Sequence, residues 1–262
     1  MLIAGIDSSL YGVNAVSTTA ILELSTYCGG LHITKGARVT LQPGVYIMKN
    51  GPLVVDKASS FTGTNVGFYF MGIRAGLIFD EDVVISLTAP KDGPMSGLLF
   101  SEERSVLNNL PLSLPSGGKG LAPRAPCDLL GQRDHRIISN DARTRLGTIY
   151  LPVGRLIVDS KTPVADQSAY KVIIARQINL YEGPDLIVKA RYGATNIPVP
   201  PRRRPKLGRY GADAVVRVSH DLTVLLHLGV IEKIGWDRRS QVRSEISRRA
   251  RDGPCSAFTG SR

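Results

Sequence analysis

Short apolar segments separated by turn-forming residues run from residue 39 to residue 100, and this pattern constrains the fold more than any other feature. Each segment is too short for a helix and is rich in β-branched or aromatic residues, so each is expected to form a strand. Gly, Pro, Asn and Asp lie between the segments, where tight turns need them. The expected strands are Val39–Leu41, Val45–Met48, Leu53–Val55, Val66–Phe70, Leu77–Phe79, Val83–Leu87 and Leu98–Phe100.

Strands this short cannot each bury a face alone, whereas stacking them in successive turns gives them a shared core. A loose repeat of about twenty residues, with two strands around a Gly- or Asn-bearing turn, favours such stacking. The Gly-Pro pairs at Gly51, Gly93 and Gly183 are interpreted as recurring corners. We therefore predict an all-β fold, a right-handed parallel β-helix of stacked short strands; an antiparallel sandwich is the alternative.

The pattern divides the chain into three regions. Residues 1–26 are a weakly patterned lead-in, and Ile21–Leu24 within them could form a first strand or a short helical turn. Residues 27–200 are predicted to form the β-helix domain. Residues 101–134 interrupt it with clustered Pro and Gly and are predicted to be an inserted loop. Residues 201–262 are predicted to be a basic tail, disordered or partly helical.

The charge of the chain is concentrated in this tail. The net charge is +11, and residues 202–262 hold 14 of the 33 Lys and Arg but only 6 of the 22 Asp and Glu. A basic amphipathic helix is expected over 237–251, where apolar residues recur every fourth position. An Arg-rich tail could bind nucleic acid, but aromatic residues are not interleaved with its basic ones. We therefore do not expect nucleic acid to be a partner.

Neither the cysteines nor the ends of the sequence indicate a metal site or a membrane segment. The cysteines, Cys28, Cys127 and Cys255, lack metal-ligand spacing; they allow one disulfide, but the sequence does not choose the pair. The first residues lack the basic region of a signal peptide, and Asp7 interrupts their apolar run. No segment reaches the roughly 18–20 apolar residues of a membrane span. The sequence as printed is expected to contain no export signal and no membrane anchor.

Several long motifs resemble one protein family. They are LQPGVYIMKNGPLVV, FTGTNVGFYF, ISLTAPKDGPMSGLLF, HRIISNDARTRLGTIYLPVGRLIVDS, PVADQSAYKVIIAR and YGATNIPVP. In this order they resemble the C-terminal region of TadG-like proteins, which belong to the tight-adherence (Flp) pilus-assembly systems of bacteria. The resemblance covers roughly residues 27–200.

The resemblance implies a non-enzymatic structural or assembly component of an adhesion pilus, which docks on other pilus-assembly or envelope proteins. It also implies a location in the cell envelope or outside the cell. Members of the family usually begin with an apolar membrane anchor, which this sequence lacks. They usually run directly from the SEER-like stretch to the HRI stretch and end near YGAT…PVP, so residues 105–132 resemble an insertion and residues 202–262 lie outside the resemblance.

The densest acidic group is Asp80-Glu81-Asp82. Its carboxylates could bind Ca²⁺ or, with a neighbouring Lys or Arg, cleave a glycosidic bond. A polysaccharide-binding or polysaccharide-cleaving β-helix is therefore the alternative function. Because adjacent strand residues point to opposite faces, three consecutive carboxylates do not converge, and a solvated turn is the preferred interpretation. We assign no catalytic, metal or cofactor-binding residue and expect no cofactor.

Other polar and aromatic groups receive structural interpretations. Glu102-Glu103-Arg104 is interpreted as an exposed loop edge, and Asn140–Arg143 as a local turn. The four histidines, His32, His135, His220 and His227, show no zinc-site spacing. Tyr46 and the segment Gly67–Phe70 could form an aromatic platform for sugars, but a stacked β-helix core is preferred.

Overall fold

The computed structural model of the chain describes residues 14–72, 74–104, 133–140, 144–159, 167–168, 171–181, 185–188, 194–198, 214–217 and 222–224.

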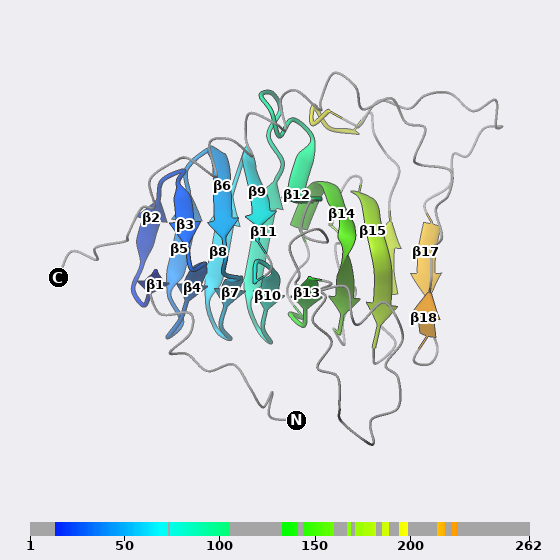
Figure 1. Cartoon of the computed structure of the whole chain (residues 1–262), viewed down its shortest axis with the longest axis horizontal. Coiled ribbons are helices and arrows are strands. Elements are labelled where there is room, and N and C mark those ends of the chain that lie inside the picture. The colour runs from blue at the N-terminus through cyan, green and yellow to red at the C-terminus, as the bar shows by residue number, and fades with distance from the viewer. Residues whose placement is uncertain are drawn as a thin grey trace, which may run out of the picture.

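Parallel strands stack turn upon turn into a β-solenoid of about five turns (Figure 1). Three strands form one turn, so the solenoid has three sheet faces. Successive turns lie side by side in chain order, from β1 to β15 (Figure 1). The predicted all-β architecture of stacked parallel strands is thereby confirmed.

Each face is a parallel ladder of strands from successive turns. The first face contains β1 (Ala15–Val16), β4 (Leu31–Ile33), β7 (Leu53–Val55), β10 (Leu77–Phe79) and β13 (Asp134–Ile137). The second contains β2 (Ala20–Leu22), β5 (Arg38–Leu41), β8 (Ser60–Gly63) and β11 (Val84–Thr88). The third contains β3 (Thr26–Cys28), β6 (Gly44–Lys49), β9 (Val66–Met71) and β12 (Leu98–Glu102).

Two long strands continue these ladders. β14 (Thr144–Val158) pairs with β11, β12 and β13 in turn, so it passes through all three faces. β15 (Lys171–Leu180) pairs with β14 along the third and first faces. The register shifts between Leu151 and Arg155, where β14 turns the corner.

The repeat is longer than the sequence suggested. Leu31, Leu53 and Leu77 are paired in register, which sets the first of these turns at 22 residues and the next at 24. On the second face, β5 and β11 match expected strands, whereas β8 between them was not expected. It reads Ser-Phe-Thr-Gly and shows little apolar signal. The Gly-Pro corners are not equivalent, since Gly51 precedes β7 whereas Gly93 lies between β11 and β12. Gly183 lies outside the described residues.

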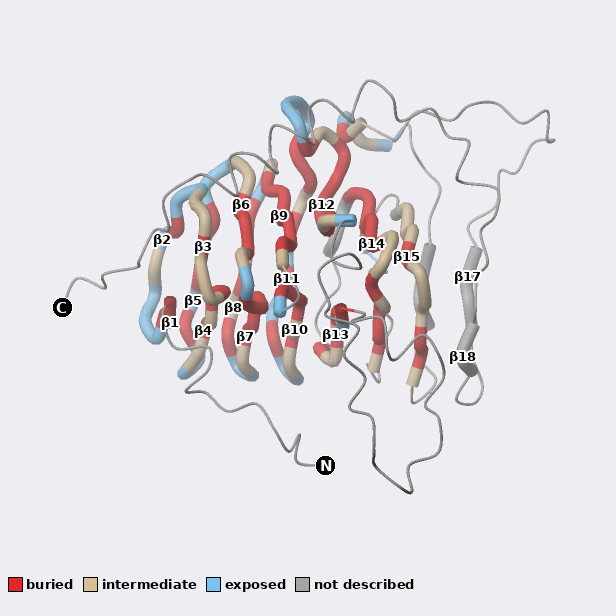
Figure 2. The backbone as a smooth tube through the Cα atoms, viewed as in Figure 1, coloured by how far each residue is buried: buried red, intermediate tan, exposed pale blue. Residues whose placement is uncertain are grey.

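Aromatic residues fill the interior of the solenoid. Much of the backbone of β6, β9 and β12, which carry several of them, is buried (Figure 2). Tyr46, Phe68 and Phe100 occupy one inward-facing ladder and are at most 1% exposed. Consecutive rings of this ladder have their centroids 5.5 Å apart. Phe61 and Phe79 pack beside it from the other two faces. The structure therefore confirms the core interpretation of Tyr46 and Phe68 over the sugar platform.

The first corner of each turn repeats one backbone conformation. Lys35, Ala58 and Asp82 all have positive φ, between 54° and 62°. They lie between the first-face and second-face strands of three successive turns. The Cβ atom makes this conformation unfavourable for any residue other than glycine, and aspartate tolerates it better than alanine or lysine.

The first turn of the solenoid begins before the predicted domain boundary at residue 27. Asn14 is buried, and its Nδ2 donates hydrogen bonds of 2.9 Å to the carbonyl oxygens of Cys28 and Gly30. Ile21 lies in strand β2, which decides between the strand and the helical turn in favour of the strand. Cys28 is disulfide-bonded, and its bonding partner lies outside the described residues.

Alkaline pH is expected to destabilise this first turn. The Tyr27 hydroxyl donates to the carbonyl oxygen of Glu23, and burial, followed by the charge of Glu23, raises the pKa of Tyr27 from 10.0 to about 12. The unfolded chain therefore ionises first, so the free energy of unfolding should fall by about 3 kcal/mol as the pH rises from about 10 to 12. Burial raises the pKa of Tyr46 as well, so both residues act in the same direction.

Urea unfolding of the wild-type chain and of Tyr27→Phe, followed across this pH range, measures the effect. The variant should lose less stability than the wild-type chain, because Tyr27 no longer titrates. Equal losses in the two proteins would contradict the assignment to Tyr27.

Part of the predicted tail pairs with the solenoid. β18 (Leu222–Val224) lies antiparallel to β15, and β17 (Ala214–Arg217) lies antiparallel to β16 (Asp185–Val188). The region beyond residue 201 is therefore not wholly separate from the domain. The helix expected over 237–251 lies outside the described residues. No helix in the described part of the chain is long and apolar enough to cross a membrane.

Deletion of residues 202–262 is expected to leave a cooperatively folding solenoid, because the core residues whose burial the structure describes, from Val16 to Ile197, already fill the stacked turns. The deletion uncovers the edge of β15 that pairs with β18, and a free strand edge promotes association. Thermal unfolding should still show one transition, while light scattering should show more self-association than for the full chain. Loss of the cooperative transition would place part of the fold's stability in the tail.

Candidate functional site

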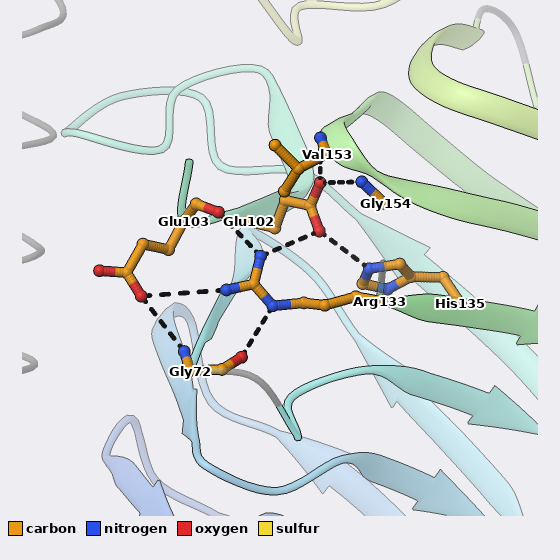
Figure 3. Close-up of polar contacts among 7 residues, drawn as sticks. All are labelled: Gly72, Glu102, Glu103, Arg133, His135, Val153 and Gly154. Atoms are coloured by element: carbon orange, nitrogen blue, oxygen red, sulfur yellow. Dashed lines mark hydrogen bonds and ion pairs between the residues drawn. The ribbon is translucent and has the colours of Figure 1, made fainter. Parts of the chain in front are cut away.

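A group of charged and polar side chains occupies positions that hold apolar residues in the neighbouring turns. Glu102 pairs in register with Phe70, which pairs with Met48, and both of these point into the core. His135 pairs in register with Leu77 on one side and Leu156 on the other. With Glu103 and Arg133, these residues form what we term the clasp (Figure 3).

Glu102 is the centre of the clasp. Its Oε1 accepts hydrogen bonds from the backbone N–H groups of Val153, at 2.8 Å, and Gly154, at 2.6 Å. Its Oε2 lies 3.2 Å from Nη1 of Arg133 and 3.3 Å from Nε2 of His135 (Figure 3). Both oxygens of the carboxylate are therefore engaged, as a buried anion requires.

Arg133 reaches the preceding turn. Its Nε donates to the carbonyl oxygen of Gly72 at 2.8 Å, and its Nη1 donates to the carbonyl oxygen of Glu103 at 2.8 Å. Its Nη2 lies 3.9 Å from Oε2 of Glu103, which also accepts a hydrogen bond from the backbone N–H of Gly72. The guanidinium thus uses its fork of donors on two separate segments of backbone.

The clasp is sealed from solvent. Arg133 is 2% exposed, Glu102 is 1% exposed and His135 is fully buried. The ring of His135 packs edge-on against Phe70, with ring centroids 5.0 Å apart. Nδ1 of His135 has no hydrogen-bond partner among the described residues. A substrate cannot reach these groups in this conformation, so their contacts indicate a structural role.

The clasp joins three successive corners of the solenoid. Gly72 belongs to the corner after β9, Glu103 to the corner after β12, and Gly154 to the corner within β14. A Cβ atom at Gly154 would lie 2.7 Å from Oε2 of Glu102, so a larger residue there would displace this carboxylate. Glu103 and Arg133 also flank residues 105–132, so the two ends of that segment are held together.

Replacement of residues 105–132 by a short Gly-Ser linker is expected to preserve the fold. The clasp residues remain, and shortening a closed loop lowers its closure entropy cost. Residues 105–132 include Cys127, so both chains carry Cys28→Ser, which removes the disulfide of Cys28 from the comparison. The thermal midpoint of the shortened chain should then equal or exceed that of the full-length chain. The control is the same linker replacement combined with Arg133→Met. This chain should unfold at a markedly lower temperature, because the substitution removes the contacts of Arg133 within the clasp. A large drop in the shortened wild-type chain would show that residues 105–132 contribute to the core.

The acidic group predicted as a weak candidate lies elsewhere. Asp80, Glu81 and Asp82 form the corner between β10 and β11, where Glu81 and Asp82 are exposed. The backbone N–H of Glu81 donates to Oδ1 of Asp80, which is a local turn contact. Among the described residues, no group of three His, Cys, Asp or Glu side chains could hold a metal ion.

The interpretation of Glu102-Glu103-Arg104 as an exposed edge is wrong for Glu102. β12 continues through Glu102, which faces inward, and only Arg104 of the three is exposed. The guanidinium of Arg104 donates to the hydroxyl of Tyr150 and lies 5.3 Å from the centre of its ring. The alternation of Glu102 with Phe100 is a sequence signal that could have placed Glu102 on the inner face. Its ion-pair partner gave no such signal, because Arg133 is 31 residues away in sequence.

The remaining histidines do not join the clasp. His32 lies on the outer surface of the first face, with its Nε2 2.9 Å from Oδ2 of Asp56. His220 and His227 lie outside the described residues, as do Asp141, Ala142 and Arg143. Asn140 lies in a turn, in keeping with its predicted role.

No family model matches the chain, and the searches of curated proteins and of solved structures gave no match either.

Proposed function

We propose that this chain is a non-enzymatic structural component of a bacterial adhesion pilus system of the tight-adherence type, and that it docks on other pilus-assembly or envelope proteins. The motifs that resemble TadG-like proteins support the biological setting. The sealed clasp supports a structural role, because its charged groups bind the chain's own backbone.

One observation supports docking most directly, namely exposed apolar side chains at the first turn. Ile21 is 67% exposed and Leu24 is 57% exposed. Among the described residues, β1, β2 and β3 each pair with one neighbour only. A strand edge with apolar residues beside it is a surface that another chain can extend. We therefore place the docking surface at this end of the solenoid, over Ile21 and Leu24.

The test is complementation in the bacterium that carries the gene. Deletion should abolish pilus-dependent attachment to surfaces, and the wild-type gene should restore it. The double variant Ile21→Lys, Leu24→Lys should fail to restore attachment although the chain accumulates. Val84→Lys is the matched control, because Val84 is 45% exposed on the second face and distant from the first turn along the solenoid. Normal attachment of the deletion strain would overturn the proposal.

A further inference from the structure

A groove with both polar and apolar lining residues lies at the corner between the second and third faces, away from the clasp and the acidic turn. Its volume is about 520 Å³, within the range of about 300–1,000 Å³ that is usual for ligand sites. Three separate segments form it: the β8–β9 corner, the start of the β11–β12 connection, and residues 194–197. The lining residues are Thr64, Asn65, Thr88, Lys91, Ala194, Thr195, Asn196 and Ile197.

The walls of the groove are fixed by contacts with the solenoid. Ile197 is 5% exposed and belongs to the core, which anchors the segment 194–197. Behind this segment, a Cβ atom on Gly97 would lie 2.0 Å from the carbonyl oxygen of Pro198, so the two backbones are in close contact. The backbone N–H of Asn65 donates to the Thr88 hydroxyl at 3.2 Å and joins the other two segments. The groove is therefore a built feature of the folded chain.

The residues that line the groove offer hydroxyl and amide groups and one positive charge. Thr88 and Thr195 each accept a backbone N–H through Oγ1, at 3.2 Å and 2.9 Å, which leaves their hydroxyl hydrogens free to donate. The amides of Asn65 and Asn196 supply both donors and acceptors. Lys91 is exposed and forms no ion pair with a described residue. None of the lining residues is acidic.

We propose that this groove binds an acidic polysaccharide through its hexuronate units. The hydroxyl and amide groups match the ring hydroxyls of a sugar, and the Lys91 ammonium matches its carboxylate by a charge-assisted hydrogen bond. Cleavage of a glycosidic bond generally uses two carboxyl groups. The described residues that line the groove include no carboxyl group, so the proposal is for binding of the polysaccharide and not for its cleavage. The groove is independent of the pilus proposal, which rests on the first turn.

The test uses isothermal titration calorimetry of the full chain with trigalacturonic acid as the probe. Lys91→Met should weaken binding about tenfold, because the charge-assisted hydrogen bond is lost. The double variant Lys91→Met, Asn196→Ala should bind trigalacturonic acid still more weakly than Lys91→Met alone. Lys57→Met is the matched control, since Lys57 is an exposed lysine at a different corner, and it should leave the affinity unchanged.

Maltotriose, a neutral trisaccharide, is the second probe, and it should bind much more weakly than trigalacturonic acid. Equal binding of the two sugars would overturn the role of the carboxylate. Equal affinity of Lys91→Met and the wild-type chain, an equal loss in Lys57→Met, or no binding of trigalacturonic acid would overturn the site itself. Circular dichroism of each variant shows whether the solenoid is folded, so a loss of affinity in a folded variant supports the site.

Discussion

Glu102→Ala is expected to lower the free energy of unfolding by about 3–5 kcal/mol, the cost of breaking a buried ion pair on one side. The substitution removes the nearer carboxylate from the buried Arg133 guanidinium and leaves only that of Glu103, 3.9 Å from Nη2. It also leaves the N–H groups of Val153 and Gly154 without their acceptor. An unsatisfied buried donor carries its own desolvation cost, so the effect exceeds the loss of a single hydrogen bond.

Urea unfolding of Glu102→Ala, of two further clasp variants and of one surface control measures the loss of stability. The comparison shows which contacts of Glu102 account for it. Glu102→Gln keeps a carbonyl acceptor for the two N–H groups, so it should cost less than Glu102→Ala. The double variant Glu102→Leu, Arg133→Met removes both charges and should recover part of the lost stability. The surface pair formed by Asp134 and Arg155 supplies the control; Asp134→Ala should cost no more than about 1 kcal/mol. A Glu102→Ala value as small as this control would show that the clasp adds little to stability.

Phe68→Ala is expected to lower the free energy of unfolding by a similar amount, about 3–5 kcal/mol, through the cavity it leaves. Phe68 is fully buried, and its ring packs against Tyr46, Phe61 and Phe100 at centroid distances of 5.5, 5.8 and 5.5 Å. The stack spans consecutive turns on the third face, so a gap at Phe68 weakens the contacts of both its neighbours.

Chemical unfolding of Phe68→Ala and Phe68→Leu tests this prediction. The leucine variant fills part of the space and should lose clearly less stability than the alanine variant. Ser86→Ala provides a surface reference, because Ser86 is exposed on the outside of β11 and its loss should be within about 0.5 kcal/mol of zero. A Phe68→Ala value near this reference would contradict a close-packed interior.

The apolar part of the fold was predictable because it rests on local pattern. Leu53–Val55 and Leu77–Phe79 were predicted with the bounds that the structure shows. β8 was not predicted, because Phe61 is the one large apolar residue of its four and the other side of the strand faces solvent. β8 belongs to the second face. Because such a short, half-polar strand gives little apolar signal, the repeat was interpreted as two strands for each turn where three are present.

The clasp could not be predicted for a different reason. Alternation with Phe100 places Glu102, the last residue of β12, on the inner face. The charge of Glu102 and of the next residue, Glu103, instead favoured an exposed edge. Burial of the carboxylate depends on Arg133, which only the stacking of turns brings within 3.2 Å. The groove has the same origin, because Thr88 and Thr195 are far apart in sequence and become neighbours only when the chain returns to the second corner.

The antiparallel pairing of β18 with β15 makes the two ends of the solenoid chemically different. Parallel stacking copies its own hydrogen-bonding edge at every turn, so a solenoid has no intrinsic length and one copy can continue another. An antiparallel strand changes the spacing of the donors and acceptors that it presents, and the next parallel turn no longer matches. β18 therefore covers Ile178–Leu180 at one end with an antiparallel edge, whereas the first turn ends in the parallel pattern that the rest of the solenoid repeats.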